Sequence, residues 1–237
     1  MVRDDPTTTM PWMRAGTDLV VGAVQALSDT QLREPSALPD WSRAHVVAHL
    51  SRNAEALVRL VHWAATGEVT PMYPSPESRA QDIEATAQQP AAVLREELAA
   101  TAALLDQRLS ALDDAGWAGT VRSALGRELT AAGLPWMRVR EVWLHAIDLD
   151  AGIGTAVFPA GLLVGLLDDV VGVVGAKPDC PPVLLHATDS DDRWTLGPDE
   201  ARIEVDGTLA DLTGWVSGRT STGLRSRDPL PTLPPWI

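Results

Sequence analysis

The sequence predicts an α+β protein of two domains: a four-helix bundle over residues 1–152, and a small α+β domain with an antiparallel sheet and helices over residues 153–237. Before about residue 150, apolar side chains repeat at helical spacing in several long segments. After it, short apolar or alternating runs lie between turn-forming clusters, which is typical of strands. A chain of 237 residues with 45% hydrophobic residues is large enough for two packed cores.

The first two helices of the bundle have clear periods and boundary residues. The opening helix is expected over residues 11–28, where a 3.6-residue period is formed by Leu19, Val20, Ala23, Val24 and Leu27. The second helix is expected to begin at an Asp40 N-cap and to continue to about Ala65. Gly67 then provides the stop signal, because glycine adopts the left-handed conformation common after a helix.

The rest of the bundle follows a loop that contains three prolines. Ser75, followed by proline and glutamate, predicts the cap of a short helix. The third long helix is expected over 90–112 and the fourth over 135–150, ending near Gly152. Residues 117–133 fit either irregular structure or short strands. Four long helices with inward-facing ligands would form a usual frame for a metal site.

The second domain is expected to open with a helix near 159–175. Strands follow at 183–188, 193–197 and 201–207, separated by the turn-forming clusters DSDD and GPDE. A final helix over 209–218 leads into a proline-rich tail. This order predicts a sheet with helices segregated from it, as in other α+β domains.

Charge and composition exclude several classes of function. A net charge of −13 argues against binding to nucleic acid or to anionic membranes. The N-terminus has no apolar secretory segment, and the most apolar stretch, 161–176, is interrupted by Asp168 and Asp169. The single cysteine, Cys180, allows no internal disulfide and suits a reducing compartment. We therefore expect a cytoplasmic protein, and we do not favour Cys180 as a nucleophile because no histidine or cation is evident beside it.

Two residues of the fourth helix suggest a metal site. Glu141 and His145 are four residues apart, so at ~100° per residue they project from one face of a helix. That face is otherwise made of Val, Trp, Leu and Ile, where an unpaired polar group is costly to bury. His49, on the apolar face of the second helix, is the best candidate for a third ligand. Three protein ligands with an open fourth position are typical of catalytic zinc.

Ordinary interpretations exist for the same residues, and spacing alone favours them. A histidine on an apolar face is often a hydrogen-bonded core residue, and Glu141 could pair with Arg138 or His145 on the helix surface. His45 lies one turn before His49 and is interpreted as a substrate-pocket or structural residue. The two remaining histidines have no partner at metal-ligand spacing and are expected to have no special role: His62 and His186.

Four segments resemble a known family in order and with matching lengths: WSRAHVVAHLSRNA (41–54), LVHWAATGEVTPMYPSPESR (60–79), LPWMRVREVWLHAIDL (134–149) and GWVSGRTSTG (214–223). The first and third resemble the ligand helices of DinB-like metal-binding four-helix bundles. The second and fourth resemble the inter-helix loop and the C-terminal signature of the mycothiol-dependent maleylpyruvate isomerases. The resemblance covers essentially the whole chain and is weakest over 117–133.

The resemblance implies a divalent metal, most simply Zn²⁺, held by His49, Glu141 and His145, with mycothiol as the thiol cofactor. It implies cis–trans isomerisation of maleylpyruvate to fumarylpyruvate in gentisate degradation, an aromatic catabolic pathway, through a metal-bound thiolate that adds reversibly to the double bond. It also places Arg219 beside the active site, where it would hold a substrate carboxylate or stabilise developing negative charge.

Alternatives remain at the level of both residue and function. Arg219 could be a solvated cation at a helix end. Asp148 could orient a ligand, although we favour an ion pair with a cation at the end of the bundle. The same site would serve a mycothiol S-transferase that conjugates electrophiles, or a non-catalytic metal- or thiol-sensing module with a protein partner. The partners expected from the favoured interpretation are small molecules, the substrate and mycothiol, with neither nucleic acid nor membrane.

Overall fold

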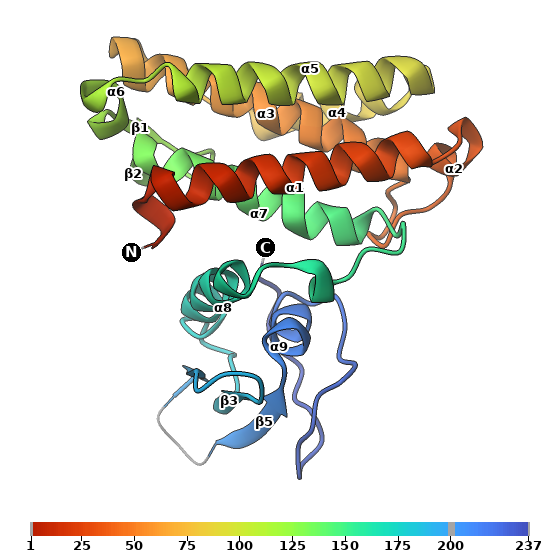
Figure 1. Ribbon diagram of the computed structural model, residues 1–237, viewed down its shortest axis with the longest axis vertical. Coiled ribbons are helices and arrows are strands. Elements are labelled where there is room, and N and C mark those ends of the chain that lie inside the picture. Colours follow the sequence, from red (N-terminus) through yellow and green to blue (C-terminus); the bar gives the residue numbers. More distant parts are fainter. Residues whose placement is uncertain (1, 199–201, 237) are drawn as a thin grey trace. The chain divides into compact units, whose positions relative to one another are not determined.

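The computed structural model describes residues 2–198 and 202–236. The chain divides into two compact units, Met1–Gly152 and Ile153–Ile237. The first unit consists mainly of helices, and the second combines a three-stranded sheet with helices (Figure 1). This confirms the predicted α+β class.

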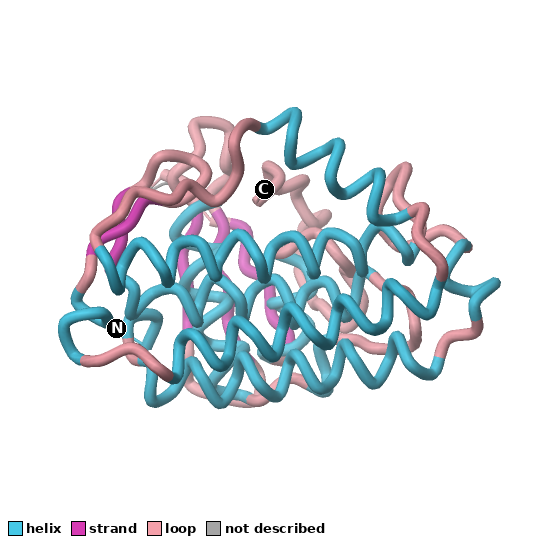
Figure 2. Tube along the Cα trace, turned by 90° about the horizontal axis from the view of Figure 1, so that it is seen from above, coloured by secondary structure: helices cyan, strands magenta, loops and turns pink. Residues whose placement is uncertain are grey.

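Four long helices build the first unit: α1 (Pro6–Ala26), α3 (Arg43–Thr66), α5 (Ala91–Ser110) and α7 (Leu134–Asp148). Helices α1 and α3 each pack against both α5 and α7, so the four close into a bundle. Figure 2 shows the helical segments running side by side along a similar direction. The predicted helices therefore exist, with shifted ends.

Shorter elements precede or connect the long helices of this unit. They are η1 (Val2–Asp4), α2 (Asp29–Arg33), α4 (Pro76–Ala87), α6 (Asp114–Ala118), β1 (Thr120–Arg122), β2 (Glu128–Thr130) and η2 (Ala131–Gly133). The segment 117–133, which was ambiguous in sequence, contains an antiparallel hairpin in which Val121 pairs with Leu129. Ser75 caps α4 by accepting from the backbone N–H of Ser78 at 3.1 Å, as its sequence context predicts.

Two predicted helix starts were wrong. Helix α1 begins at Pro6 rather than near residue 11, because Asp5 caps it by accepting from the backbone N–H of Thr7. Helix α3 begins after Ser42 rather than after Asp40. Asp40 has a φ of 62° and belongs to the preceding turn, which an isolated bridge between Pro35 and Ser42 closes.

Helix α7 is held closely against α1. A Cβ added at Gly16 of α1 would lie 2.5 Å from side-chain atoms of Val142 and Trp143, so glycine allows the approach. The indole N–H of Trp143 donates to the carbonyl of Trp12 at 2.9 Å. This contact fixes the rotation of α7 about its axis and therefore the face that it turns toward α3.

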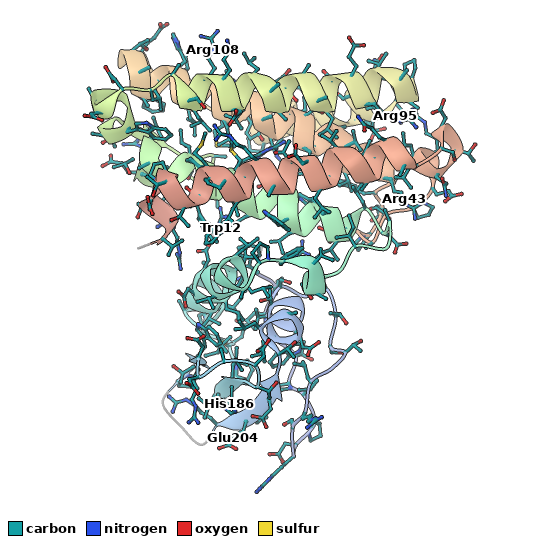
Figure 3. All side chains as sticks on the ribbon, viewed as in Figure 1. Trp12, Arg43, Arg95, Arg108, His186 and Glu204 are labelled. Atoms are coloured by element: carbon teal, nitrogen blue, oxygen red, sulfur yellow. The ribbon has the colours of Figure 1, made fainter. Side chains whose placement is uncertain are left out.

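Two arginines tie helix ends of the first unit together (Figure 3). Arg43, at the start of α3, donates to the carbonyls of Leu149 at 2.7 Å and Asp150 at 2.9 Å, just after α7. Arg95 of α5 donates to the carbonyl of Leu27, just after α1, at 2.7 Å. Cations bound to terminal carbonyls satisfy groups that a helix leaves without internal partners.

The described residues of the second unit form, in chain order, η3 (Thr155–Val157), α8 (Ala160–Val174), β3 (Val183–Ala187), β4 (Arg193–Leu196), β5 (Ile203–Gly207) and α9 (Leu209–Val216). The strands form one sheet in the order β4-β3-β5. Val183, Leu185 and Ala187 of β3 are buried, while the two residues between them are half-buried. This alternation gives the sheet one face toward the core, where α8 packs on β4 and α9 on β3 and β5.

The sheet is mixed, whereas we had predicted an antiparallel one. β3 and β4 are antiparallel, but β3 and β5 are parallel. Leu196, at the end of β4, and Ile203, at the start of β5, both pair with Val183. The chain therefore passes from one side of β3 to the other at the same end of that strand, which makes β5 parallel to it.

Among the described residues, no helix is long and apolar enough to cross a membrane.

Candidate metal centre

Helices α3 and α7 bring His49, Glu141 and His145 together. Each side chain offers one possible ligand atom, and these atoms all lie within 4.8 Å of one another. His49 Nε2 lies 2.8 Å and His145 Nε2 3.3 Å from the same carboxylate oxygen, Oε2 of Glu141. The two imidazole rings meet edge to face with their centroids 4.7 Å apart. Both ring nitrogens and the carboxylate thus converge on one small space.

The cluster is recessed but accessible. The side chain of His49 is 5% exposed, that of His145 16% and that of Glu141 25%. The indole of Trp41 packs against the His49 imidazole, with ring centroids 5.6 Å apart. One side of the cluster is therefore closed by apolar surface, and the carboxylate of Glu141 is partly exposed to solvent.

Burial and hydrogen bonding set the protonation of the three groups. Burial lowers the pKa of His49, and Glu141 offsets this only in part. Burial also opposes charge on His145, but hydrogen bonds to Asp148 and Glu141 raise the pKa of that imidazole above its ordinary value. Burial alone would raise the pKa of Glu141, yet the hydrogen bonds of His145 and His49 hold it well below the usual range. An ionised carboxylate between two imidazoles is the state that attracts a cation.

The donor set fits a divalent metal ion. Two imidazole nitrogens and one carboxylate oxygen match zinc sites that keep a fourth position for a small ligand. Zinc-ligating histidines usually donate their other ring N–H to an acceptor that fixes their orientation. His145 has such an acceptor, because its Nδ1 lies 2.9 Å from Oδ2 of Asp148.

Asp148 lies within hydrogen-bonding distance of His145, as its interpretation as an orienting acceptor predicts. Its side chain is only 2% exposed and lies on the same helix face as His145. His45, which we interpreted as a pocket or structural residue, belongs to the start of α3: its Nδ1 accepts from the backbone N–H of Ser42 at 3.2 Å. The Nε2 of His45 lies 3.1 Å from Oε2 of Glu84 in α4. His45 thus links two helices beside the candidate site.

Arg138, missed in the sequence as a site residue, joins the two ligand helices. The whole residue is 1% exposed, and its Nη1 donates to the carbonyl of Leu50 and to Oδ1 of Asn53, both at 2.8 Å. Burial lowers its pKa to about 10, so the guanidinium remains charged at neutral pH, and the charge of Glu141 favours that state. Arg138 therefore fixes the spacing of α3 and α7 next to His49 and partly compensates the buried carboxylate.

Arg79 and Tyr73 complete the immediate surroundings of the site and were also missed. Nη2 of Arg79, in α4, lies 3.2 Å from Nδ1 of His49. The same guanidinium lies 5.7 Å from the centroid of the Tyr73 ring, within the range of a cation–π contact. Tyr73 is the only tyrosine of the chain. Both residues belong to the segment 60–79, whose resemblance to a family loop was the one signal that could have pointed to them.

Comparisons with known proteins now decide the family. A model of the mycothiol maleylpyruvate isomerase N-terminal domain matches residues 13–150, and one of the MDMPI C-terminal domain matches residues 158–235. The chain belongs to the mycothiol maleylpyruvate isomerase family. The crystal structure of a mycothiol-dependent maleylpyruvate isomerase superposes with a TM-score of 0.91 at 32% identity, covering 97% of this chain and 96% of that chain. A histidine-to-alanine mutant of the mycothiol-dependent maleylpyruvate isomerase gives a TM-score of 0.93 at 31% identity and the same coverage.

Proteins of similar sequence include two without a named activity. Two uncharacterized proteins, from two strains of Mycobacterium tuberculosis, are each 27% identical over 229 residues, which is 91% of this chain and 86% of theirs. The similarity to these two proteins therefore extends over both units of the chain.

Arg219 lies in the unit matched by the family's C-terminal domain. Helix α9 ends in a Schellman motif, in which the Arg219 N–H donates to the Gly214 carbonyl at 2.8 Å and the Gly218 N–H to Trp215 at 2.9 Å. Gly218 has the positive φ of 78° that this motif requires. Nη1 of Arg219 donates to the carbonyl of Ser217 at 2.6 Å. Its position at a helix end is thus clear, and its role toward substrate remains a prediction.

The remaining residues singled out in the sequence form local contacts. Burial raises the pKa of the Cys180 thiol, which does not favour it as a nucleophile. Nε2 of His62 lies 3.3 Å from the carboxylate of Glu68, and Nδ1 of His186 lies 2.9 Å from that of Asp206. Neither histidine belongs to a group of three potential metal ligands among the described residues.

Proposed function

We propose that this protein is a metal- and mycothiol-dependent isomerase that converts maleylpyruvate to fumarylpyruvate. The convergence of His49, Glu141 and His145 in a recessed, accessible site carries the proposal. Family membership over both units and the 32% identity to a mycothiol-dependent maleylpyruvate isomerase support it. The proposal includes Zn²⁺ as the metal, a cytoplasmic location and a place in gentisate degradation.

His49, Glu141 and His145 would hold the metal. When bound, the metal would keep the thiol of mycothiol deprotonated, and reversible addition of that thiol would give the substrate's double bond temporary single-bond character. Asp148 keeps the Nε2 of His145 directed at the site by accepting from its Nδ1. Arg138 holds the backbone of α3 against α7, so that the ligands of both helices stay in register.

Arg219 would bind a carboxylate of the substrate or stabilise the negative charge that develops during addition. Its planar guanidinium can contact a carboxylate through two parallel N–H donors. The Schellman motif supports this role, since it fixes the backbone from which the side chain extends. A side chain on a fixed backbone loses less entropy when it binds an anion.

The test is a direct assay of the reaction. Purified, zinc-loaded protein is incubated with mycothiol and maleylpyruvate, and the loss of the cis isomer is followed together with the appearance of fumarylpyruvate. We expect turnover that needs both zinc and mycothiol. Accumulation of a stable mycothiol conjugate instead would identify an S-transferase. No reaction with any electrophile, together with a stable protein partner, would favour the sensing module.

A further inference from the structure

In the two histidines of the candidate metal centre, the Nδ1 atoms face groups of opposite hydrogen-bonding character. Nδ1 of His145 faces Oδ2 of Asp148 at 2.9 Å, which is a hydrogen-bond acceptor. Nδ1 of His49 faces Nη2 of Arg79 at 3.2 Å, which can only donate. His145 therefore has the acceptor expected at the Nδ1 of a histidine that binds a metal through Nε2, whereas His49 has a donor there.

The contact between Arg79 and His49 specifies a tautomer. Arginine cannot accept a hydrogen bond, so the contact requires a lone pair on Nδ1 of His49. The hydrogen of the neutral ring is then on Nε2, from which it can donate to Glu141 at 2.8 Å. A histidine that gives its Nε2 lone pair to a metal carries its hydrogen on Nδ1 instead. The hydrogen bond from Arg79 and metal ligation through Nε2 thus exclude each other.

Once detached from His49, the guanidinium would remain beside the site. It packs over the ring of Tyr73 at 5.7 Å, and this cation–π contact is independent of the tautomer of His49. Among the residues that the structure describes, no ion pair joins Arg79 to a carboxylate. The side chain is half-buried, so its charge is partly desolvated. A cation in this setting favours an incoming anion.

We propose that Arg79 is a substrate-binding residue: metal loading of His49 releases its guanidinium, which then binds a carboxylate of the ligand next to the metal. The inference rests on the proposed function for the identity of that ligand, a cis-dicarboxylate. It adds to Arg219 a second carboxylate-binding cation, one that belongs to the same unit as the metal ligands. Two parallel N–H donors from Arg79 would fix the orientation of the bound carboxylate.

A purely supporting role for Arg79 makes a different prediction. If its contact with His49 served to orient a metal ligand, its removal would weaken metal binding by about 10–100-fold. If the contact instead competes with ligation, its removal leaves the zinc affinity unchanged or raises it. The sign of the change in zinc affinity therefore separates the two roles without any activity measurement.

The experiment compares wild-type protein with Arg79→Gln and the control Arg14→Gln. Arg14 pairs with Asp106 and Ser110, away from the candidate ligands. Its substitution by glutamine removes one positive charge, as Arg79→Gln does, without touching the site. Zinc affinity is measured by competition with a chromophoric chelator. Binding of maleate, a simple cis-dicarboxylate, to the zinc-loaded proteins is measured by calorimetry, and circular dichroism checks that each variant is folded.

We expect Arg79→Gln to bind zinc at least as tightly as the wild type and maleate at least about tenfold more weakly, because the variant loses the charge-assisted hydrogen bonds to the carboxylate. Arg14→Gln should change neither affinity. Unchanged maleate binding in folded Arg79→Gln, or a tenfold loss of zinc affinity, would overturn the proposal. Because maleate binding needs neither mycothiol nor turnover, failure of the isomerase assay and failure of this inference are separate results.

Discussion

Replacing Asp148 by asparagine tests how the structure prepares His145 for metal binding. The side chain of the aspartate is 2% exposed and accepts from Nδ1 of His145 at 2.9 Å. Asparagine has nearly the same shape and can still accept through its side-chain oxygen, but it carries no charge. The substitution therefore removes a charge–dipole interaction and leaves the packing of α7 intact.

The expected magnitude follows from this geometry. Asp148 provides the largest of the interactions that raise the pKa of His145, so its loss makes the imidazole a weaker base and a weaker ligand. Loss of such an orienting carboxylate typically costs 10–100-fold in metal affinity. This corresponds to about 1.4–2.7 kcal/mol of binding free energy, since each factor of ten is about 1.4 kcal/mol.

Chelator competition with zinc measures the affinity of Asp148→Asn, and thermal unfolding of the metal-free protein reports whether the fold is retained. A melting temperature close to that of the wild type, combined with a 10–100-fold weaker zinc affinity, is the expected pair of results. Equal zinc affinities would refute the reasoning, because they would mean that Asp148 does not act on His145 as a ligand.

Three further predictions concern other parts of the account. Arg138→Met should destabilise the metal-free protein by about 1–3 kcal/mol in urea unfolding, because it leaves the Leu50 carbonyl and Oδ1 of Asn53 without their buried donor; a loss below 1 kcal/mol would contradict this role. Arg219→Ala should retain zinc but lose about 10²–10³-fold in turnover, with little recovery in Arg219→Lys, whereas near-wild-type turnover would return Arg219 to a helix-end cation. Zinc affinity should fall as the pH drops, beginning above 6.5, because the raised pKa of His145 lets protons compete there. A zinc affinity that stays constant between pH 6 and 8 would exclude this competition. The stability of the metal-free protein depends on pH in the opposite direction: protonated His145 stabilises the fold below pH 6.5, and this contribution is lost as the pH rises through the raised pKa of His145.

The parts of the site that sequence analysis could find are those fixed by helix periodicity. Glu141 and His145 share a face because they are four residues apart on one helix. His49 could be added because it is a polar residue within an apolar helix face. Such reasoning needs only the backbone of each helix, and the structure brings these three residues together.

Residues that act through long side chains could not be found in this way. Arg138 lies one turn before Glu141, and only the packed structure shows its guanidinium bonded to α3 rather than to that carboxylate. Arg79 reaches His49 from a separate short helix after a proline-rich loop. These contacts depend on tertiary packing, so no local sequence period records them.

Two of the three errors in the fold have similarly specific causes. Asp40 and Ser42 are both good N-cap residue types, and the choice between them depends on the turn closed by Pro35. The alternation of residues in β5 predicts a strand but not its direction, which depends on where the chain crosses β3. The element types were therefore predictable, while this boundary and this pairing were not.

Metal content of His49→Ala and His145→Ala tests the central claim most directly. The account predicts that the wild-type protein binds a single zinc ion per chain and turns over maleylpyruvate with mycothiol. Both variants should lose metal and activity together, while their circular dichroism stays helical because the bundle core does not depend on these side chains. Full zinc content in both purified variants would contradict the assignment of this site.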